Sequence, residues 1–295
     1  MEQPMSIQQD LSNKIMVVTG ANSGIGFEAA LDFARRGATV AIVCRNEQRG
    51  QAAVEELQRR SRNKQVSLYL ADFSLLKSVA EAAARLRRDF PRIDVLCNNA
   101  GAANARRQVT AEGFELTFAA NHLGGFLLTR MLMPSLLAAA QRGEARIVFT
   151  SSYGHNSGPL DFGDLDFEKN YGGLKAYGRS KLMNLLTARE LHRRYRQQNI
   201  IASSFHPGAV RTPIWSKGGA MGRLLGLVLY PFMVSVQQGA DTLIWLASSP
   251  EAANADGHYF VKRRRGRVAS FATDAAAERL WDESVKRVEP YSGFV

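Results

Sequence analysis

Thr19-Gly20-Ala21-Asn22-Ser23-Gly24-Ile25-Gly26 is the stretch that decides the fold, because a short apolar run precedes it and a helical pattern follows it. Residues 15–18 are typical of a buried strand, and residues 24–36 predict a helix that stops at Gly37. Glycines at this spacing permit a tight turn and a close approach to a pyrophosphate, at which the helix N-terminus points its free N–H groups. The alternative is merely a tight strand–helix turn. In this context the motif predicts a dinucleotide site at Gly20, Asn22, Ser23, Gly24, Ile25 and Gly26.

Short apolar runs alternate with longer helical patterns along the rest of the chain. The predicted strands are residues 38–44, 66–70, 93–97, 146–150, 200–205 and 259–261, and the predicted helices are 47–60, 75–88, 126–140, 177–197 and 237–247. This alternation predicts an α/β fold with a mainly parallel sheet, doubly wound by right-handed crossovers. We expect a single Rossmann-type domain over residues 1–295, with a core at 12–285 and a seven-stranded sheet. Ligands should bind beyond the carboxyl ends of the strands, where the strand order reverses.

The composition is that of a globular protein, with 45% hydrophobic residues in a chain of 295. The two cysteines, Cys44 and Cys97, lie in apolar runs, which favours buried free thiols over a disulfide. That usage predicts a reducing, cytoplasmic location. No spacing of His, Cys and carboxylate residues resembles a metal site, so no metal is expected.

The net charge of +11 is compatible with nucleic acid, an anionic membrane surface or a small anionic ligand. Most of this charge lies in helical patterns, where a solvated face is the default. A denser run is either solvated surface or a peripheral contact with a membrane or another anionic partner. It consists of Lys262, Arg263, Arg264, Arg265 and Arg267. No nucleic-acid-binding motif accompanies the charge, so no nucleic-acid partner is expected.

Two stretches bear on membrane insertion. Residues 1–14 are polar and lack an apolar core region, which predicts no secretory signal. Elsewhere in the chain, residues 221–236 are expected to be the most apolar stretch, but they contain Arg223 and Pro231. They are also shorter than the roughly 20 residues that a spanning helix needs. We therefore expect no membrane-spanning helix.

The end of the second predicted strand is where a dinucleotide site reads the adenosine ribose, about 20 residues beyond the glycine loop. A carboxylate there would bond the 2′-hydroxyl and select NAD. This chain has Cys44-Arg45 instead, and a guanidinium can pair with a 2′-phosphate. Arg45 therefore predicts NADP(H), the alternative being an exposed loop cation.

Tyr177 and Lys181 lie one helical turn apart, on one face of a predicted helix. A free tyrosine has a pKa of about 10, and a neighbouring ammonium favours the phenolate. Tyr177 is thus a candidate general acid for carbonyl reduction, or base for alcohol oxidation. Ser151 and Ser152 end the fifth predicted strand, where a hydroxyl can bond a substrate oxygen, unless they are loop or capping residues.

Together these residues resemble the short-chain dehydrogenase/reductase family over about residues 12–285. The matching motifs are residues 19–26, Asn98-Asn99-Ala100-Gly101, Ser152, Tyr177 with Lys181, and residues 207–212. The resemblance implies that Tyr177 donates or accepts the proton. It also implies that Lys181 lowers the pKa of Tyr177 and holds the nicotinamide ribose, and that Ser152, in preference to Ser151, orients the substrate carbonyl.

The resemblance implies further contacts around this centre. Asn121 would complete a tetrad by positioning a water that connects to Lys181. Asp72 would contact the adenine amino group; the physical alternative is a helix N-cap, and one side chain could not easily serve both roles. Asn99 and Ala100 would line the adenosine side. The expected cofactor contacts are Gly20, Asn22, Ser23, Gly24, Ile25, Gly26, Arg45, Asp72, Asn99, Ala100, Tyr177, Lys181, Pro207, Gly208, Val210 and Thr212, of which Val210 and Thr212 would hold the carboxamide and diphosphate.

Within the family, the retinol dehydrogenase-like branch looks most similar. The resemblance lies in Cys44-Arg45, Asn121-His122-Leu123-Gly124, residues 160–177 and His206-Pro207-Gly208. This branch implies NADP(H) and a small hydrophobic carbonyl or alcohol substrate. Reduction of an activated C=C bond, as in protochlorophyllide reductases, is an alternative; a non-catalytic NADP-binding protein is another. A homodimer through helices 126–140 and 177–197 is also left open, and His122, His155 and His206 are expected to be structural.

Three variable segments, residues 102–108, 153–174 and 214–235, are expected to contact the substrate. The last is apolar, with Gly218, Gly219 and Gly222 as hinges. It predicts a lid that closes over a large apolar substrate and excludes water. The alternatives are a helix packed permanently on the core and a docking surface for a membrane or a partner.

Overall fold

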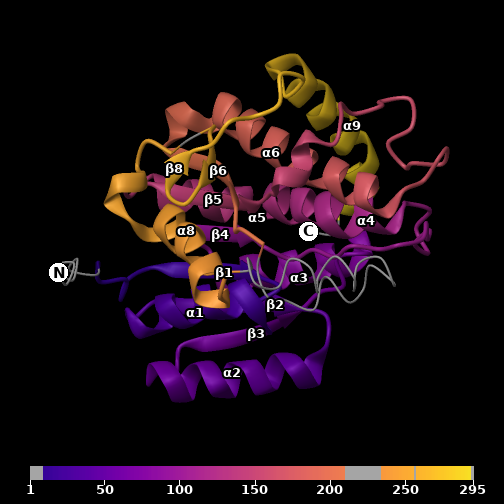
Figure 1. Cartoon of the computed structure of the whole chain (residues 1–295). Helices are drawn as coiled ribbons and strands as arrows, with labels where there is room; N and C mark the ends of the chain where they lie inside the picture. Colours follow the sequence, from indigo (N-terminus) through magenta and orange to yellow (C-terminus); the bar gives the residue numbers. More distant parts are fainter. Residues whose placement is uncertain (1–8, 210–233, 256, 294–295) are drawn as a thin grey trace.

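The computed structural model describes residues 9–209, 234–255 and 257–293 (Figure 1). The strands are β1 (Ile15–Thr19), β2 (Thr39–Cys44), β3 (Val66–Leu70), β4 (Val95–Asn98), β5 (Ala145–Thr150), β6 (Ile200–His206), β7 (Tyr259–Val261) and β8 (Arg264–Arg265). The helices are α1 (Gly24–Arg35), α2 (Glu47–Ser61), α3 (Leu76–Asp89), α4 (Leu116–Phe118), α5 (Gly124–Ala140), α6 (Gly173–Tyr195), α8 (Val236–Ser248) and α9 (Asp274–Ser292). Shorter turns include η1 (Ala119–Leu123) and η2 (Tyr153–Asn156).

The sheet has the order β3-β2-β1-β4-β5-β6-β7-β8, and all neighbouring strands are parallel except β7 and β8. The predicted doubly wound α/β fold is confirmed, with eight strands instead of seven. The extra strand follows a turn at Lys262 and Arg263, whose φ angles of 50° and 59° reverse the chain. Because the chain runs from β1 outward to β2 and β3 and then returns to β4, the crevice lies beyond β1 and β4.

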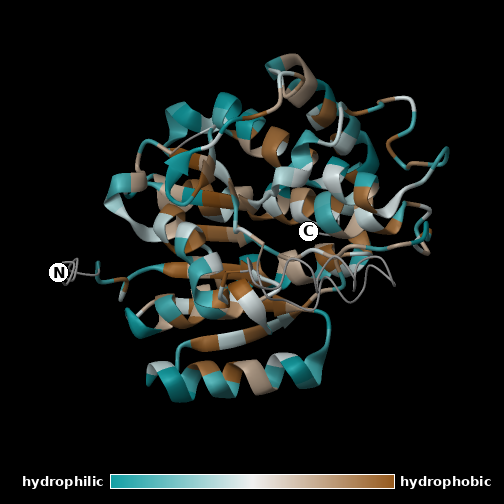
Figure 2. Ribbon diagram, viewed as in Figure 1, coloured by the Kyte–Doolittle hydropathy of each residue, from teal (hydrophilic) through white to brown (hydrophobic). Residues whose placement is uncertain are grey.

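Side chains on each strand alternate between two buried clusters, one on each face of the sheet. On β1, Val17 belongs to one cluster, whereas Met16 and Val18 belong to the other. Helices α3, α5, α6 and α9 complete the first cluster, and α1, α2 and α8 complete the second. Figure 2 shows the strands largely in hydrophobic brown, while the outer face of α2 is hydrophilic teal. Because apolar side chains are buried on both faces, the helices hold the sheet in place. This also fixes the positions of the strand ends that carry the site.

Residues Leu116–Ala140, which include α4 and α5, form a helical stretch long and apolar enough to cross a membrane, with a mean hydropathy of 1.5. Within the fold, however, 78% of its apolar window is buried. The helix continues through Pro134 and packs against the sheet. Its composition is accounted for by its place in the core. The apolar segment singled out at residues 221–236 lies, up to residue 233, outside the described residues.

Helix α9 was not among the helices predicted from the pattern, and it packs against α3, α5 and α6. Its Thr273 cap accepts a hydrogen bond from the backbone N–H of Ala276. Trp281 meets the ring of Phe126 edge-on at 5.0 Å between centroids, and the Arg194 guanidinium lies 4.7 Å above the Trp281 ring. Helix α9 therefore covers part of the two helices through which a homodimer was left open.

The imidazole of His122 joins this helix to the core. Its Nε2 lies 2.8 Å from the hydroxyl of Ser284 on α9, and its ring stacks on Phe118 at 5.7 Å. Burial lowers the pKa of His122 to about 3. The buried imidazole is therefore neutral at pH 7, as a structural histidine should be.

The depressed pKa of His122 predicts a loss of stability in acid. An unfolded histidine has a pKa of about 6.5, so the contribution of His122 is complete above that pH and is lost as the pH falls toward the folded value of about 3. In His122→Gln, whose amide nitrogen can still reach Ser284, the free energy of unfolding should fall less steeply, by up to about 1.4 kcal/mol per pH unit. Urea unfolding at pH 7, 6, 5 and 4 measures both slopes. Equal slopes would contradict the prediction.

Candidate active site

The glycine loop packs directly on the segment that follows β4. Gly20 and Gly24 have φ angles of +67° and +62°, which a side chain rarely adopts. A Cβ on Gly20 would lie 3.0 Å from Cα of Ala100, and one on Gly26 would lie 2.6 Å from Nδ2 of Asn99. These glycines therefore create a surface on which a ligand can approach the backbone.

The N-terminus of α1 is available to an anion. Its N-cap, Ser23, makes no side-chain capping bond within the described residues, and the first turn holds no acidic side chain. The first N–H groups of a helix need an acceptor, and a phosphate supplies one. This loop and helix terminus thus fit the pyrophosphate of a dinucleotide.

The ends of β1, β4 and β5 are tied together by Thr19 and Asn99. The Thr19 hydroxyl accepts hydrogen bonds from the backbone N–H groups of Asn99 and Ala100, both at 2.9 Å. The Asn99 side chain donates to the Thr19 carbonyl at 3.0 Å and accepts from the Thr150 hydroxyl at 3.3 Å. The Asn99 amide, expected to line the adenosine side, is therefore engaged in holding three strand ends together.

Arg45 and Asp72 meet at the carboxyl ends of β2 and β3. The Arg45 guanidinium lies 3.6 Å from one carboxylate oxygen of Asp72, and its side chain is 72% exposed. The other oxygen of Asp72 accepts from the N–H and hydroxyl of Ser74, at 3.0 and 2.6 Å. Both residues thus lie at the expected adenosine end of the crevice.

Asp72 is not the N-cap of α3, so that alternative is wrong. The cap position is Leu75, which has no capping side chain. The distant Glu112 takes this role, with its carboxylate accepting from the N–H groups of Leu76 and Lys77 at 2.6 and 3.0 Å. Nothing in the local pattern around α3 could indicate a cap supplied from another loop.

Tyr177, Lys181 and Ser152 come together at the carboxyl end of β5. Helix α6 begins earlier than predicted, at Gly173, so Tyr177 lies in its second turn. The buried Lys181 ammonium donates to the carbonyl of Thr150 at 3.1 Å and lies 5.3 Å from the centroid of the Tyr177 ring. This places a cation, a phenol and a hydroxyl around one point of the crevice.

The protonation of these groups is set mainly by burial. Burial raises the pKa of the Tyr177 phenol, and a hydrogen bond with the Ser152 side chain lowers it in part. Burial also lowers the pKa of Lys181 to about 8. The expected lowering of the Tyr177 pKa by Lys181 is therefore not found: burial raises this pKa, Ser152 offsets part of the rise, and the Lys181 ammonium is directed to the Thr150 carbonyl.

The two serines after β5 have different partners. The Ser151 hydroxyl is buried and donates to the backbone carbonyl of Lys181 at 2.7 Å. The Ser152 hydroxyl accepts from the N–H of Gly154 at 3.2 Å and is close enough to the Tyr177 phenol to lower its pKa. Only the second hydroxyl therefore reaches the phenol, as the preference for Ser152 requires.

Asn121 lies in the π-helical turn η1, a wider turn that is frequent at functional sites. Its side-chain oxygen accepts from the N–H of Ala102 at 2.7 Å, and its nitrogen donates to the Ala102 carbonyl at 2.8 Å and to the Ser180 hydroxyl at 2.9 Å. A Cβ on Gly101 would lie 3.3 Å from both the Asn121 side chain and the Lys181 ammonium. Asn121 and Lys181 are thus neighbours across Gly101.

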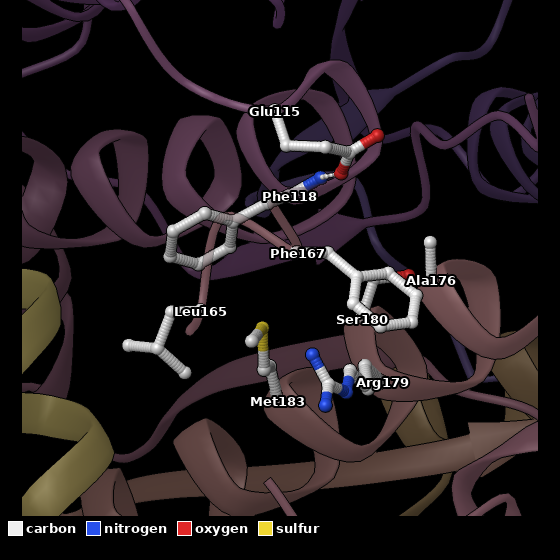
Figure 3. Close-up of a pocket in the computed structure, with 8 residues that line it drawn as sticks. All are labelled: Glu115, Phe118, Leu165, Phe167, Ala176, Arg179, Ser180 and Met183. Carbon is white, nitrogen blue, oxygen red and sulfur yellow. Dashed lines mark hydrogen bonds between the residues drawn. The ribbon is translucent and has the colours of Figure 1, made fainter. Parts of the chain in front are cut away.

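Ser180 was missed by the sequence reasoning. Its buried hydroxyl accepts from Asn121 and donates to the backbone carbonyl of Tyr177 at 2.7 Å, so it links two of the proposed catalytic residues. Beside it lies a small pocket of about 10 Å³, shown in Figure 3. The cavity is lined by Glu115, Phe118, Leu165, Phe167, Ala176, Arg179, Ser180 and Met183. It has room for about one water and none for a substrate.

The remaining expected contacts follow β6. Gly208 has a φ of +90°, and a Cβ there would lie 3.1 Å from the Val234 side chain. It follows Pro207, and both lie at the carboxyl end of β6, beside the crevice. Val210, Thr212 and residues 214–233 of the expected lid lie outside the described residues.

Cys44 and Cys97 are buried free thiols, as predicted. Among residues 9–209, 234–255 and 257–293, no group of three or more His, Cys, Asp and Glu side chains could hold a metal ion.

The chain is similar to known proteins of one family. A profile of the short chain dehydrogenase family matches residues 14–221. Retinol dehydrogenase 12 of Mus musculus is 39% identical over 275 residues, which cover 93% of this chain and 86% of that protein. A protein of Streptomyces sp. (strain C5), named as the daunorubicin C-13 ketoreductase DnrU, is 38% identical over 280 residues, or 94% of this chain and 93% of that protein.

Solved structures show the same fold. A crystal structure of an uncharacterised protein from Mycobacterium paratuberculosis has a TM-score of 0.75 and 30% identity, with 94% of both chains covered. A short-chain dehydrogenase of Shigella flexneri complexed with NADP has a TM-score of 0.64 and 25% identity, over 87% of this chain and 100% of that one.

The chain therefore belongs to the short-chain dehydrogenase/reductase family, as its motifs predicted. Within that family it lies in the retinol dehydrogenase-like branch, and it is an oxidoreductase that transfers hydride with a nicotinamide cofactor.

The assigned role of Tyr177 predicts a separation between binding and turnover. In Tyr177→Phe the phenolic proton is lost but the ring and helix are kept, so kcat should fall by about 10²- to 10⁴-fold. Cofactor binding, followed by quenching of protein fluorescence, should change little. Tyr195→Phe, at the far end of the same helix, is the matched control and should keep full turnover. Full activity in Tyr177→Phe would refute the assigned role.

Proposed function

We propose that this protein is an NADP(H)-dependent oxidoreductase that interconverts a small hydrophobic aldehyde or ketone and its alcohol. The observation that carries the proposal is the convergence of Ser152, Tyr177 and Lys181 beside the glycine loop. Neither a scaffold nor a simple binding protein needs a half-buried phenol and hydroxyl beside a buried ammonium at the mouth of a dinucleotide crevice. The names of the two relatives, which refer to retinol and to the C-13 ketone of daunorubicin, support a carbonyl or alcohol carbon as the reacting centre.

The side chains divide the chemistry between them. A bound nicotinamide supplies or accepts the hydride. For reduction, Ser152 orients the substrate oxygen by hydrogen bonding, and the Tyr177 phenol gives its proton to that oxygen. For oxidation, the same phenol takes the proton from the alcohol. Lys181, held by the Thr150 carbonyl, provides a positive charge that stabilises the phenolate left after reduction.

Selection of NADP(H) is proposed to depend on Arg45. The end of β2 carries this exposed guanidinium and no carboxylate, so a ribose 2′-phosphate would meet a cation there. Asp72 lies 3.6 Å from the guanidinium, at the ends of β2 and β3. The pairing between Arg45 and Asp72 is loose and exposed, so a phosphate can replace or share it at little cost.

The Arg45 assignment predicts a selective loss of NADPH affinity. In Arg45→Ala the Kd for NADPH should rise by about 10- to 100-fold, because a charge-assisted hydrogen bond contributes about 1.5–3 kcal/mol. The Kd for NADH should stay within about twofold. Arg49→Ala, an exposed arginine on the adjoining helix α2, is the matched control. Equal losses for both cofactors would argue against the assigned role.

The reaction itself is tested by following NADPH and NADH absorbance with a panel of aldehydes and ketones that range from short aliphatic compounds to retinal. We expect turnover with NADPH and a rise in kcat/KM with the apolar size of the substrate. Binding of NADPH without turnover of any carbonyl compound would contradict the proposal.

A further inference from the structure

The turn that follows Ser152 forms hydrogen bonds with both its side-chain hydroxyl and its backbone carbonyl. Its hydroxyl accepts from the N–H of Gly154 at 3.2 Å. Its carbonyl accepts two N–H groups of His155, the backbone N–H at 3.1 Å and the ring Nδ1 at 2.7 Å. The shorter of the two bonds to the Ser152 carbonyl thus comes from the His155 side chain, which is not one of the proposed catalytic residues.

The bond to the Ser152 carbonyl fixes the tautomer of His155. A carbonyl oxygen only accepts, so Nδ1 must carry the hydrogen. Burial lowers the pKa of His155, which favours the neutral ring, and Nε2 is then an unprotonated acceptor. Among the described residues Nε2 has no hydrogen-bond partner. The imidazole therefore makes one directional contact, and that contact is with Ser152.

The ring of His155 is itself held by the sheet. It is fully buried and meets the ring of Tyr259 edge-on, with 4.7 Å between centroids and 67° between planes. Tyr259 lies on β7 and is paired in register with Ser204 on β6. A continuous path of contacts thus leads from a central strand through Tyr259 and His155 to the backbone of Ser152.

We propose that His155 is a positioning residue, which fixes the Ser152 hydroxyl against the Tyr177 phenol through the hydrogen bond from Nδ1 to the Ser152 carbonyl. This inference rests on the proposed function for its effect on turnover. Loss of the bond frees the peptide plane of Ser152, and a displacement of the hydroxyl by about 1 Å is enough to lower the rate by up to about 10²-fold. His155 does not touch the reacting atoms in this scheme.

Two substitutions separate the hydrogen bond from the packing. In His155→Asn, the amide nitrogen occupies the place of Nδ1 and can donate to the same carbonyl. In His155→Leu, the volume is filled without a donor. We expect kcat to fall by about 10- to 100-fold in the leucine variant, with KM and NADPH affinity nearly unchanged, and to stay within about threefold in the asparagine variant. Asn156→Ala is the matched control, because it removes a bond from the same turn that is directed to Tyr153.

A second readout needs no substrate. The Ser152 bond lowers the pKa of Tyr177, so displacing that hydroxyl should raise it. The phenol is titrated by phenolate absorbance, as the difference between each protein and the same protein carrying Tyr177→Phe. The other titratable groups facing Tyr177 in the described part of the chain, Lys181 on α6 and Tyr259 on β7, are identical in all variants. The pKa of Tyr177 should be higher in His155→Leu than in the wild-type protein, and in His155→Asn it should be close to the wild-type value.

The outcomes are distinct. Equal impairment of the leucine and asparagine variants, or an unchanged Tyr177 titration in the leucine variant, would overturn the inference. If wild-type protein turns over no carbonyl compound, the proposed function fails, while the titration still decides the role of His155. Should His155→Leu not fold, as judged by its thermal transition, His155→Gln replaces it, because its longer amide reaches toward Nε2 and away from the Ser152 carbonyl.

Discussion

The site depends on one constraint, the joining of β1 and β4 at the point where strand order reverses. The hydroxyl of Thr19 donates to the carbonyl of Cys97 and accepts from the N–H groups that follow β4. These bonds hold the carboxyl ends of β1 and β4 side by side, although the two strands are distant in sequence. The glycine loop can then pack against Ala100 without a side chain between them. The contact between the ends of β1 and β4 positions the other parts of the crevice. The N-terminus of α1, which can face a phosphate, lies on one side of it, and the groups after β5 lie on the other.

Burial gives these groups their chemical character. In water a phenol and an ammonium both have pKa values of about 10, too high for either group to exchange protons readily at neutral pH. Inside the crevice, desolvation brings the pKa of Lys181 down to about 8, while a hydrogen bond from Ser152 offsets part of the rise that burial imposes on Tyr177. Asn121 bonds Ala102 in both directions and Ser180 as well, so the amide is fixed before any ligand is considered.

Much of this arrangement could be predicted from the sequence, because its signals are local. The loop at residues 19–26, the tyrosine and lysine one turn apart and the serines after β5 each follow from residue type and spacing, and parallel strands bring their ends together. The parts that escaped prediction depend on partners far along the chain. Glu112 caps α3 from another loop, and Ser180 links Asn121 to Tyr177. Helix α9 is different, because its Thr273 cap and the helical spacing of Ala277, Leu280, Trp281 and Val288 are local signals that could have predicted it. The extra strand β8 depends on a left-handed turn at two basic residues that nothing in their type favours.

The position of α9 has a consequence for how the chain acquires its structure. Leu280, Trp281 and Val288 of this helix belong to the same buried cluster as the inner faces of α3, α5 and α6. These residues emerge from the ribosome after every strand of the sheet, so the cluster beneath α9 stays exposed to water throughout most of synthesis. The opposite face, closed by α1, α2 and α8, can be completed earlier. During translation the two faces of the sheet therefore differ in how long their apolar side chains stay exposed to water. The face covered by α5 and α6, which carries Asn121 and Tyr177, is the one that would engage chaperones until α9 docks.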